Sequence, residues 1–271
     1  MTALGNGEHG LGIRGTDFTI GGSDIGDGNL ISGNGGWAAL TLQATNPTYA
    51  VIQGNMIGTN RLGTATLPNI HTGIHVSGTN VLIGGTTTTA GNLVSGNNDS
   101  GIYVEGTVAY TATVINNIVG TDIDGENVIA NGVHGIRLFH FQHAEIYDNL
   151  ISGNHKWSAL SLTGSESAEA TATIQGNFVG TNRDGTKALR NRGVGVYVED
   201  TNVLIGGSED EQRNLISGNE GQGIHIENRL AMPFTATVTN NYMGTAISVS
   251  YTHLRAHETV LDLVCRLLLE K

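Results

Sequence analysis

Two glutamates in the C-terminal half of the sequence could, by residue type and position, hydrolyse a glycosidic bond. Glu199 and Glu227 each close a short segment of one pattern, GVYVE and GIHIE. Hydrolysis needs two carboxyl groups flanking the bond, about 5 Å apart for retention or about 6.5–9.5 Å apart for inversion. If the segments form neighbouring strands, the carboxyl groups approach the shorter separation, with Tyr197 and His225 beside them. Acidic neighbours also arise by chance in a repetitive sequence, so this pair is only a catalytic candidate.

One acidic loop superficially suggests a calcium site. Asp122, Asp124 and Glu126 lie in TDIDGE, and a calcium loop needs about six oxygen ligands at fixed spacing. Corresponding loops begin with Asn60 and Asn182, so the acidic ligands do not recur. We expect a solvated turn there and predict no metal or other cofactor. No Cys and His spacing indicates zinc, and no nucleophile elbow supports Ser-His-Asp catalysis.

A recurring strand offers a second kind of site, a surface for binding glycans. The segment GIRG (12–15) recurs as GIHV, GIYV, GIRL, GVYV and GIHI, and in degenerate form as AALTL and SALSL. The outward-facing position of each copy holds Arg14, Thr41, His75, Tyr103, Arg137, Ser161, Tyr197 and His225. The next outward position holds Thr16, Gln43, Ser77, Glu105, Phe139, Thr163, Glu199 and Glu227.

These outward positions predict a ramp suited to an extended sugar chain. Parallel strands lie about 4.8 Å apart, so eight copies would span roughly 34 Å. The candidate glycan-binding residues are Arg14, His75, Tyr103, Arg137, Tyr197 and His225. The alternative is an ordinary solvated face on which cross-strand packing favours aromatic residues.

Two further aromatic groups leave alternatives open. Trp37 and Trp157 enter the two degenerate copies of the strand; they either cover the stack or stack on a sugar from an exposed rim. His140 and His143 lie in FHFQH, in the one copy that lacks a following loop. They form either a local binding patch or a change that covers the exposed sheet.

The elements that must position these residues are given by an internal repeat. IQGNMIGT (52–59) recurs as INNIVGT, IQGNFVGT and TNNYMGT, and NLISGN (29–34) recurs three more times with one conservative change. Each of eight copies contains three short β-branched runs separated by Gly and Asn, the signature of strands and turns. Inward apolar positions alternate with outward polar ones. We therefore predict a parallel β-solenoid of about eight coils with three strands in each.

A lone asparagine opens the third strand of every coil. The eight positions are Asn29, Asn55, Asn92, Asn117, Asn149, Asn177, Asn214 and Asn241. Eight amides in register predict a stacked ladder in which each side chain bonds the next. Their expected role is structural.

Composition excludes several classes of protein. The 271 residues carry a net charge of −11, and nucleic-acid binding needs a basic footprint. No apolar run approaches the roughly 18 residues of a membrane span, and no signal peptide opens the sequence. Gly is frequent but has no three-residue period, which excludes collagen.

The last 24 residues differ from the rest. Residues 248–271 contain the single Cys and no Gly, and they have the spacing of a Leu-rich amphipathic helix. VSYTHLRAHET and LVCRLLLEK resemble one reading frame of a transposase-type sequencing adapter. We expect this segment to be non-native; the alternative is a genuine capping helix.

Residues 1–247 resemble the right-handed parallel β-helix superfamily that includes pectate lyases. The resemblance rests on the IGT-x-x-x-GT and GNLISGN arrays (for example 57–64 and 91–97, with conservative changes), which are similar to those of large secreted bacterial proteins. It implies an all-β solenoid of a secreted or cell-surface protein. Both ends look cut, so further repeats of the same chain are expected on either side.

One such scaffold hosts many functions. We expect a structural or adhesin-like scaffold, with a polysaccharide or cell-surface glycan as partner along the first sheet. The alternative is a polysaccharide-active lyase or glycoside hydrolase. The pectate-lyase mechanism needs an acidic calcium cluster with an Arg or Lys base, and 1–247 contains only Lys156 and Lys187 as lysines. The first hypothesis is therefore a protein without enzymatic activity.

Overall fold

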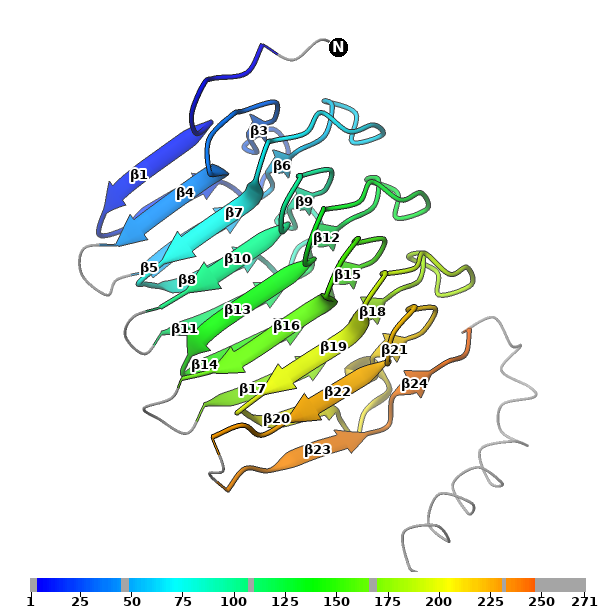
Figure 1. Cartoon of the computed structure of the whole chain (residues 1–271). Helices are drawn as coiled ribbons and strands as arrows, with labels where there is room; N and C mark the ends of the chain where they lie inside the picture. The colour runs from blue at the N-terminus through cyan, green and yellow to red at the C-terminus, as the bar shows by residue number, and fades with distance from the viewer. Residues whose placement is uncertain (1–3, 45–48, 107–109, 166–169, 231–232, 247–271) are drawn as a thin grey trace, which may run out of the picture.

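The chain folds as a right-handed parallel β-helix (Figure 1). The computed structural model describes residues 4–44, 49–106, 110–165, 170–230 and 233–246. The predicted solenoid is confirmed: three parallel sheets each contain eight strands, one from each successive coil. The tail at 248–271, with its adapter-like sequence and alternative helix, lies outside the described residues.

The three sheets differ in strand length. The first sheet holds β1 (Leu11–Gly15), β4 (Ala38–Ala44), β7 (Thr72–Ser77), β10 (Ile102–Glu105), β13 (Ile136–Phe141), β16 (Ser158–Gly164), β19 (Val194–Glu199) and β22 (Ile224–Glu227). The second holds β2 (Phe18–Gly21), β5 (Tyr49–Gln53), β8 (Asn80–Gly84), β11 (Thr111–Ile115), β14 (His143–Tyr147), β17 (Thr171–Gln175), β20 (Asn202–Gly206) and β23 (Ala236–Thr239). The third holds the two-residue strands β3 (Leu30–Ile31), β6 (Met56–Ile57), β9 (Leu93–Val94), β12 (Ile118–Val119), β15 (Leu150–Ile151), β18 (Phe178–Val179), β21 (Leu215–Ile216) and β24 (Tyr242–Met243). A single turn of 3-10 helix, η1 (Asp210–Gln212), is the one helical element of the described chain.

The core is a set of apolar columns that run between the sheets. Ile74, Ile102 and Ile136 are register neighbours on three successive strands of the first sheet, and all three side chains are fully buried. A single coil cannot bury its own apolar face, so each coil depends on its neighbours for its core.

The register of the first coil corrects one expectation. Gly12 pairs with Thr41, and Arg14 pairs with Gln43. Arg14 therefore belongs to the second outward row, and Gly12 takes its place in the first. The physical reason is that Leu11 and Ile13 supply the inward apolar pair, so the repeat begins at Gly10; the string GIRG is a second, overlapping match shifted by two residues.

The eight asparagines that open the third-sheet strands form a continuous ladder of hydrogen bonds. Each Nδ2 donates to the Oδ1 of the asparagine in the next coil, at 2.8–3.1 Å, from Asn29 through Asn241. The backbone N–H of Asn117 also donates to Asn149 Oδ1, and its Nδ2 donates to Ile83 O. The ladder thus satisfies buried polar groups at the corner between the second and third sheets.

A second ladder, which was not predicted, runs along the corner between the third and first sheets. Its members are Asn6, Asn34, Asn69, Asn97, Asn131, Asn154, Asn191 and Asn219, linked at 2.8–3.1 Å. They come alternately from NLISGN-type strings and from the ends of long loops. No single sequence motif therefore identifies all eight members of this ladder.

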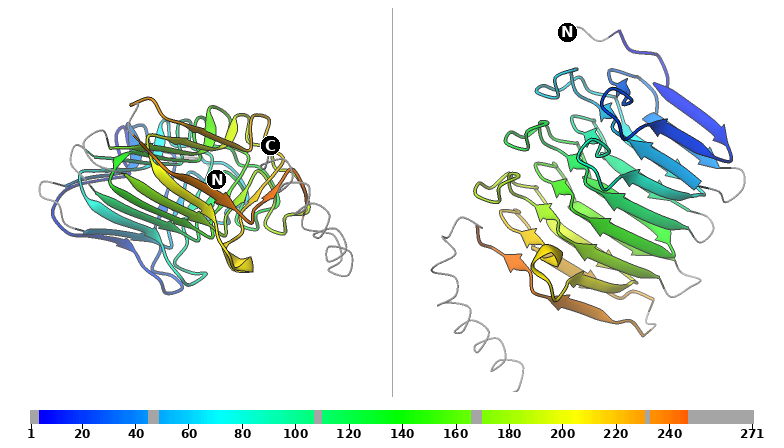
Figure 2. Two further views of the ribbon diagram at one scale, coloured as in Figure 1. Left: turned by 90° about the horizontal axis from the view of Figure 1, so that it is seen from below. Right: turned by 180° about the vertical axis from the view of Figure 1, so that it is seen from behind.

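Long loops extend the third sheet on every second coil. The loops at 59–68, 121–130 and 181–190 stack along one edge of the helix (Figure 2). Ile123 N donates to Gly63 O at 3.0 Å, and Arg183 N donates to Gly125 O at 3.1 Å. The described residues include no helix long and apolar enough to cross a membrane.

Candidate functional site

The outward face of the first sheet brings the predicted glycan-binding residues into one row, except for Arg14. Strand pairing places His75, Tyr103 and Arg137 on successive strands, followed by Ser161, Tyr197 and His225. The second row runs through Arg14, Gln43, Ser77, Glu105, Phe139, Thr163, Glu199 and Glu227. The two rows contact each other through hydrogen bonds and through the cation–π contact of Arg137 with Phe139.

In the N-terminal part of the row, on β7 and β10, the side chains bond one another and cover the sheet. His75 Nε2 lies 3.1 Å from Glu105 Oε1, and the Tyr103 hydroxyl donates to Glu105 Oε2 at 2.5 Å. The Trp37 ring meets the His75 ring edge-on at 4.3 Å, and His75 is only 3% exposed. Burial lowers the pKa of His75 more than Glu105 raises it, so the imidazole is neutral near pH 7.

Arg137 spans the middle of the face. Its guanidinium lies 5.3 Å from the Tyr103 ring centre and 5.0 Å from the Phe139 ring centre, within the range of cation–π attraction. These two contacts place the guanidinium beside the covered N-terminal part of the row.

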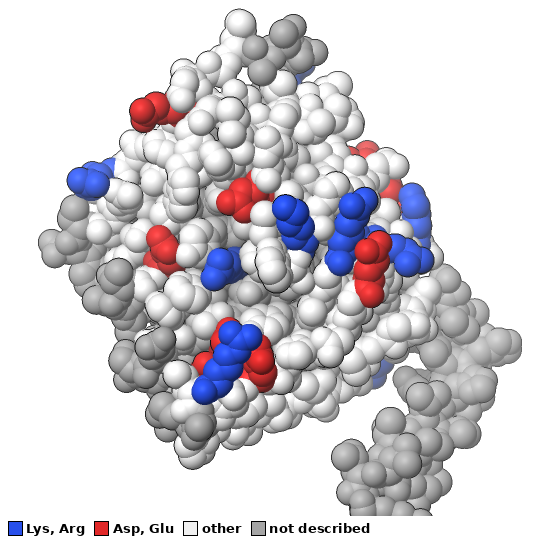
Figure 3. Space-filling model, viewed as in Figure 1, with Lys and Arg blue, Asp and Glu red and all other residues white. Residues whose placement is uncertain are grey.

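Below Arg137 the face opens into a cleft of about 750 Å³. Its lining comes from the last four coils and includes Arg137, Trp157, Tyr197, Gln222, His225 and the two glutamates with Arg229. Trp157 is 72% exposed at its rim. The size falls within the range of small-molecule sites. Figure 3 shows basic and acidic side chains in contact on the lower part of this face.

The two candidate catalytic glutamates are neighbours but are joined by a cation. Arg229 contacts Glu199 Oε1 at 3.0 Å and Glu227 Oε1 at 2.7 Å. The Tyr197 hydroxyl contacts Glu199 Oε2 at 3.0 Å and also bonds Glu227. The hydrogen bond from Tyr197, and then Arg229, lower the pKa of Glu227.

This arrangement favours a charged carboxylate at Glu227. A general acid for glycoside cleavage needs a raised pKa, which is the opposite of the shift at Glu227. Arg229 was not among the predicted residues because it belongs to no repeat string. Arg229 can form ion pairs with both glutamates only because β19 pairs with β22, which places the two carboxylates beside it.

His134 is a further residue of the cleft that the sequence did not single out. It is 9% exposed, and its Nδ1 lies 2.9 Å from the Ser158 Oγ. Burial, assisted by the charge of Arg137, lowers the pKa of His134 to about 4. The cleft therefore has a neutral histidine at its edge at neutral pH.

This shift predicts a loss of stability in acid. An unfolded histidine has a pKa of about 6.5, so below that pH the unfolded state binds the proton and the folded state does not. Stability contributed by His134 is complete above about pH 6.5 and is lost as the pH falls towards about 4, by up to about 3 kcal/mol. Urea unfolding at pH 7.5 and pH 4.5 should show a larger drop for the wild type than for His134→Gln. Equal drops would contradict the assignment.

The acidic loop is stabilised by its own contacts. Asp122 Oδ1 accepts hydrogen bonds from the backbone N–H of Glu126 and Asn127, and Oδ2 accepts one from Asn127 Nδ2 at 2.6 Å. The Glu126 carboxylate accepts from Asn182 Nδ2. In the described part of the chain no three His, Cys, Asp or Glu side chains gather as metal ligands do. The geometry is that of a turn-closing aspartate, which Asn182 reproduces one loop later.

FHFQH does not form a single patch. His140 has φ of 60° at a β-bulge, and its ring stacks on Phe139 at 3.8 Å. Phe141 points into the core and is fully buried, whereas His143 Nδ1 lies 2.7 Å from Thr171 Oγ1 on the second sheet. The bulge thus separates the two histidines onto different sheets.

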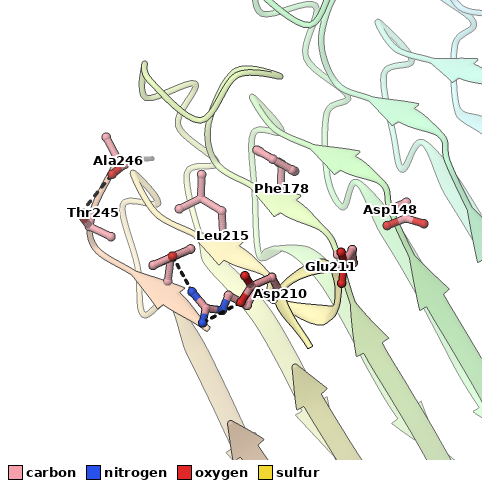
Figure 4. Close-up of a pocket in the computed structure, with 10 residues that line it drawn as sticks. Asp148, Phe178, Asp210, Glu211, Leu215, Thr245 and Ala246 are labelled. Atoms are coloured by element: carbon pink, nitrogen blue, oxygen red, sulfur yellow. Dashed lines mark hydrogen bonds and ion pairs between the residues drawn. The ribbon is translucent and has the colours of Figure 1, made fainter. Parts of the chain in front are cut away.

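A second cavity, of about 360 Å³, lies beside the coil formed by β13, β14 and β15. This coil has no long loop between its second and third strands. Asp148 and Glu211 lie on one side of it, with Thr245 and Ala246 at the other end (Figure 4). Arg213 pairs with Asp210 at 2.9 Å and donates to the Tyr242 hydroxyl at 2.6 Å. These contacts are local, and no glycan candidate lines this cavity.

The chain was also compared with known proteins. No protein-family model, no curated protein and no solved structure matches it.

Proposed function

We propose that the chain is a structural β-helix scaffold of a secreted or cell-surface bacterial protein, with a carbohydrate-binding cleft on its first sheet. The observation that supports the scaffold best is the pair of asparagine ladders, each of which passes through all eight described coils. Buried, fully hydrogen-bonded networks stiffen a fold. A rod of this kind holds a binding surface at a fixed distance and orientation.

The cleft supports the carbohydrate part of the proposal. Trp157 and Tyr197 offer aromatic faces, and Glu199, Gln222 and Arg229 offer acceptors and donors. Sugars need both kinds of group, because a pyranose has an apolar C–H face and a polar rim of hydroxyls. The resemblance to the superfamily of pectate lyases adds to this argument, since an adhesin or an enzyme could use the same face.

Screening on an array of bacterial, plant and animal glycans tests the proposal. The wild-type chain should bind at least one class of glycan, and Tyr197→Ala should weaken that binding. Tyr49→Ala, at the exposed first position of the second-sheet strand β5, is the matched control and should leave binding unchanged. Absence of binding to every glycan on the array would contradict the carbohydrate part of the proposal.

A polysaccharide-active enzyme is the alternative, supported by the adjacency of Glu199 and Glu227. The scaffold proposal predicts no release of reducing ends or unsaturated products from any polysaccharide that binds. Turnover by the wild type that falls at least about 100-fold in both Glu199→Gln and Glu227→Gln would establish the enzyme instead. Turnover unaffected by both substitutions would reject these residues as catalytic.

A further inference from the structure

The first sheet contains the same aromatic arrangement twice, four coils apart. Strands β4 and β16 are each preceded by a tryptophan, and each is followed in the sheet by two strands with outward aromatic or histidine residues. The equivalent residues are Trp37 and Trp157, His75 and Tyr197, Tyr103 and His225, and Glu105 and Glu227. The two ring pairs have similar geometry: His75 and Tyr103 lie 5.4 Å apart at 32°, and Tyr197 and His225 lie 5.6 Å apart at 24°.

At the position nearer the N-terminus the tryptophan packs on the first ring of the pair. The Trp37 indole stands on the His75 ring at 4.3 Å and 87° and leaves that ring 3% exposed. The Trp37 indole therefore covers the His75 ring of this pair, although the indole itself is 49% exposed.

At the lower position the tryptophan is turned away. Trp157 is 72% exposed, and no ring contact with Tyr197 forms among the described residues. Its backbone has φ of 45°, in the left-handed region that bulky residues avoid, whereas Trp37 has no positive φ. The change of backbone explains why the indole points outward and why the cleft above Tyr197 and His225 stays open.

The polar lining of the open position indicates what could fill it. Its charged residues are two arginines and two glutamates, so the lining has no net charge when its histidines are neutral. Arg229 already contacts both carboxylates, and Arg137 lies against Tyr103 and Phe139. A carboxylated sugar would meet the two glutamates, whereas the hydroxyls of a neutral sugar can donate to them.

We propose that a neutral hexopyranose ring binds above Tyr197 and His225, at the place that corresponds to the position of Trp37 four coils earlier, and that Trp157 closes over it. This inference rests on the proposed carbohydrate-binding function and names its ligand class. The sugar packs its C–H face on the aromatic pair, and its hydroxyls bond the Glu199 and Glu227 carboxylates. Closure of Trp157 covers the opposite face of the ring.

The two tryptophans of the chain make the closure measurable. Trp37→Phe leaves Trp157 as the single tryptophan, and Trp157→Phe leaves Trp37; excitation at the red edge of the absorption band avoids the seven tyrosines. The probes are maltotetraose, cellotetraose, mannotetraose and tetragalacturonate. When at least one neutral probe binds to the Trp37→Phe variant, the emission of Trp157 should shift to the blue. Acrylamide should then quench this emission less. Trp157→Phe should show no change, because Trp37 lies four coils away from the cleft and already contacts the His75 ring. By calorimetry, Trp157→Ala should bind the same probe roughly ten-fold more weakly.

The outcomes separate this inference from the proposed function. Tighter binding of tetragalacturonate than of every neutral probe would overturn the ligand class while leaving carbohydrate binding in place. Neutral binding that Trp157→Ala does not weaken, or that leaves the Trp157 emission unchanged, would overturn the closure. Failure of the wild type to bind any of the four probes would overturn the inference, and failure to bind every glycan on the array as well would overturn the carbohydrate part of the proposed function.

Discussion

Replacing Asn117 by alanine is expected to lower the free energy of unfolding by about 3–5 kcal/mol. The side chain lies in the middle of the first ladder and is 1% exposed. Its Oδ1 accepts from both Asn92 N, at 3.0 Å, and Asn92 Nδ2, at 2.9 Å, while its Nδ2 donates to Ile83 O at 2.9 Å. Alanine would leave these buried groups without partners, each at a cost of about 1–3 kcal/mol.

Asn98→Ala is the matched control for this ladder variant. Asn98 is exposed and adjoins the second ladder, of which it is not a member. Its replacement should change stability by less than about 0.5 kcal/mol. Asn117→Asp should cost at least as much as Asn117→Ala, because a carboxylate would face the Asn149 Oδ1 and Ile83 O acceptors. Urea unfolding followed by circular dichroism measures all three, and similar midpoints for Asn117→Ala and Asn98→Ala would contradict the structural role of the ladder.

Gly120→Ala is expected to lower the free energy of unfolding by about 3–4 kcal/mol, because alanine is strained at this backbone angle and its methyl group would overlap the next coil. Gly120 has φ of 94° at the end of the third-sheet strand β12. A Cβ there would overlap the Ser152 carbonyl oxygen of the next coil and lie 2.6 Å from Asn154 Oδ1, a member of the second ladder. The added methyl group would therefore push two coils apart.

Gly26→Ala separates the two causes. Gly26 has a similar φ of 99°, but a Cβ there would meet nothing within 4 Å. This variant should lose only the backbone part, about 1 kcal/mol. The difference between the two unfolding free energies reports the close approach of coils. Equal losses in Gly26→Ala and Gly120→Ala would mean that the coils are not packed as described.

The repeat alone was sufficient to predict the fold and the first ladder. The three β-branched runs per copy and the single in-register asparagine are local patterns, and a solenoid converts such patterns directly into strands and columns. The same regularity made the outward row predictable from Thr41 to His225. It failed at Arg14, because two overlapping strings in HGLGIRG fit the repeat and only strand pairing distinguishes them.

The features that the sequence did not predict depend on three-dimensional juxtaposition. The second ladder alternates between two unlike strings, so its asparagines share a corner of the fold without sharing a motif. Arg229 occurs once and gains its partners only when β22 pairs with β19. The cleft is open because Trp157 has a backbone conformation that Trp37 lacks, and residue type alone does not indicate this.

Hydrogen–deuterium exchange of the wild-type chain, with and without the tightest binder from the glycan array, tests the central claim most directly. A rigid scaffold with a cleft on its first sheet predicts slow exchange along the buried strands of all the sheets in the free protein. It also predicts that added protection falls on peptides covering 133–141, 157–163, 194–199 and 222–229. Protection confined to the stacked loops at 59–68, 121–130 and 181–190, or fast exchange throughout the free coils, would contradict the account.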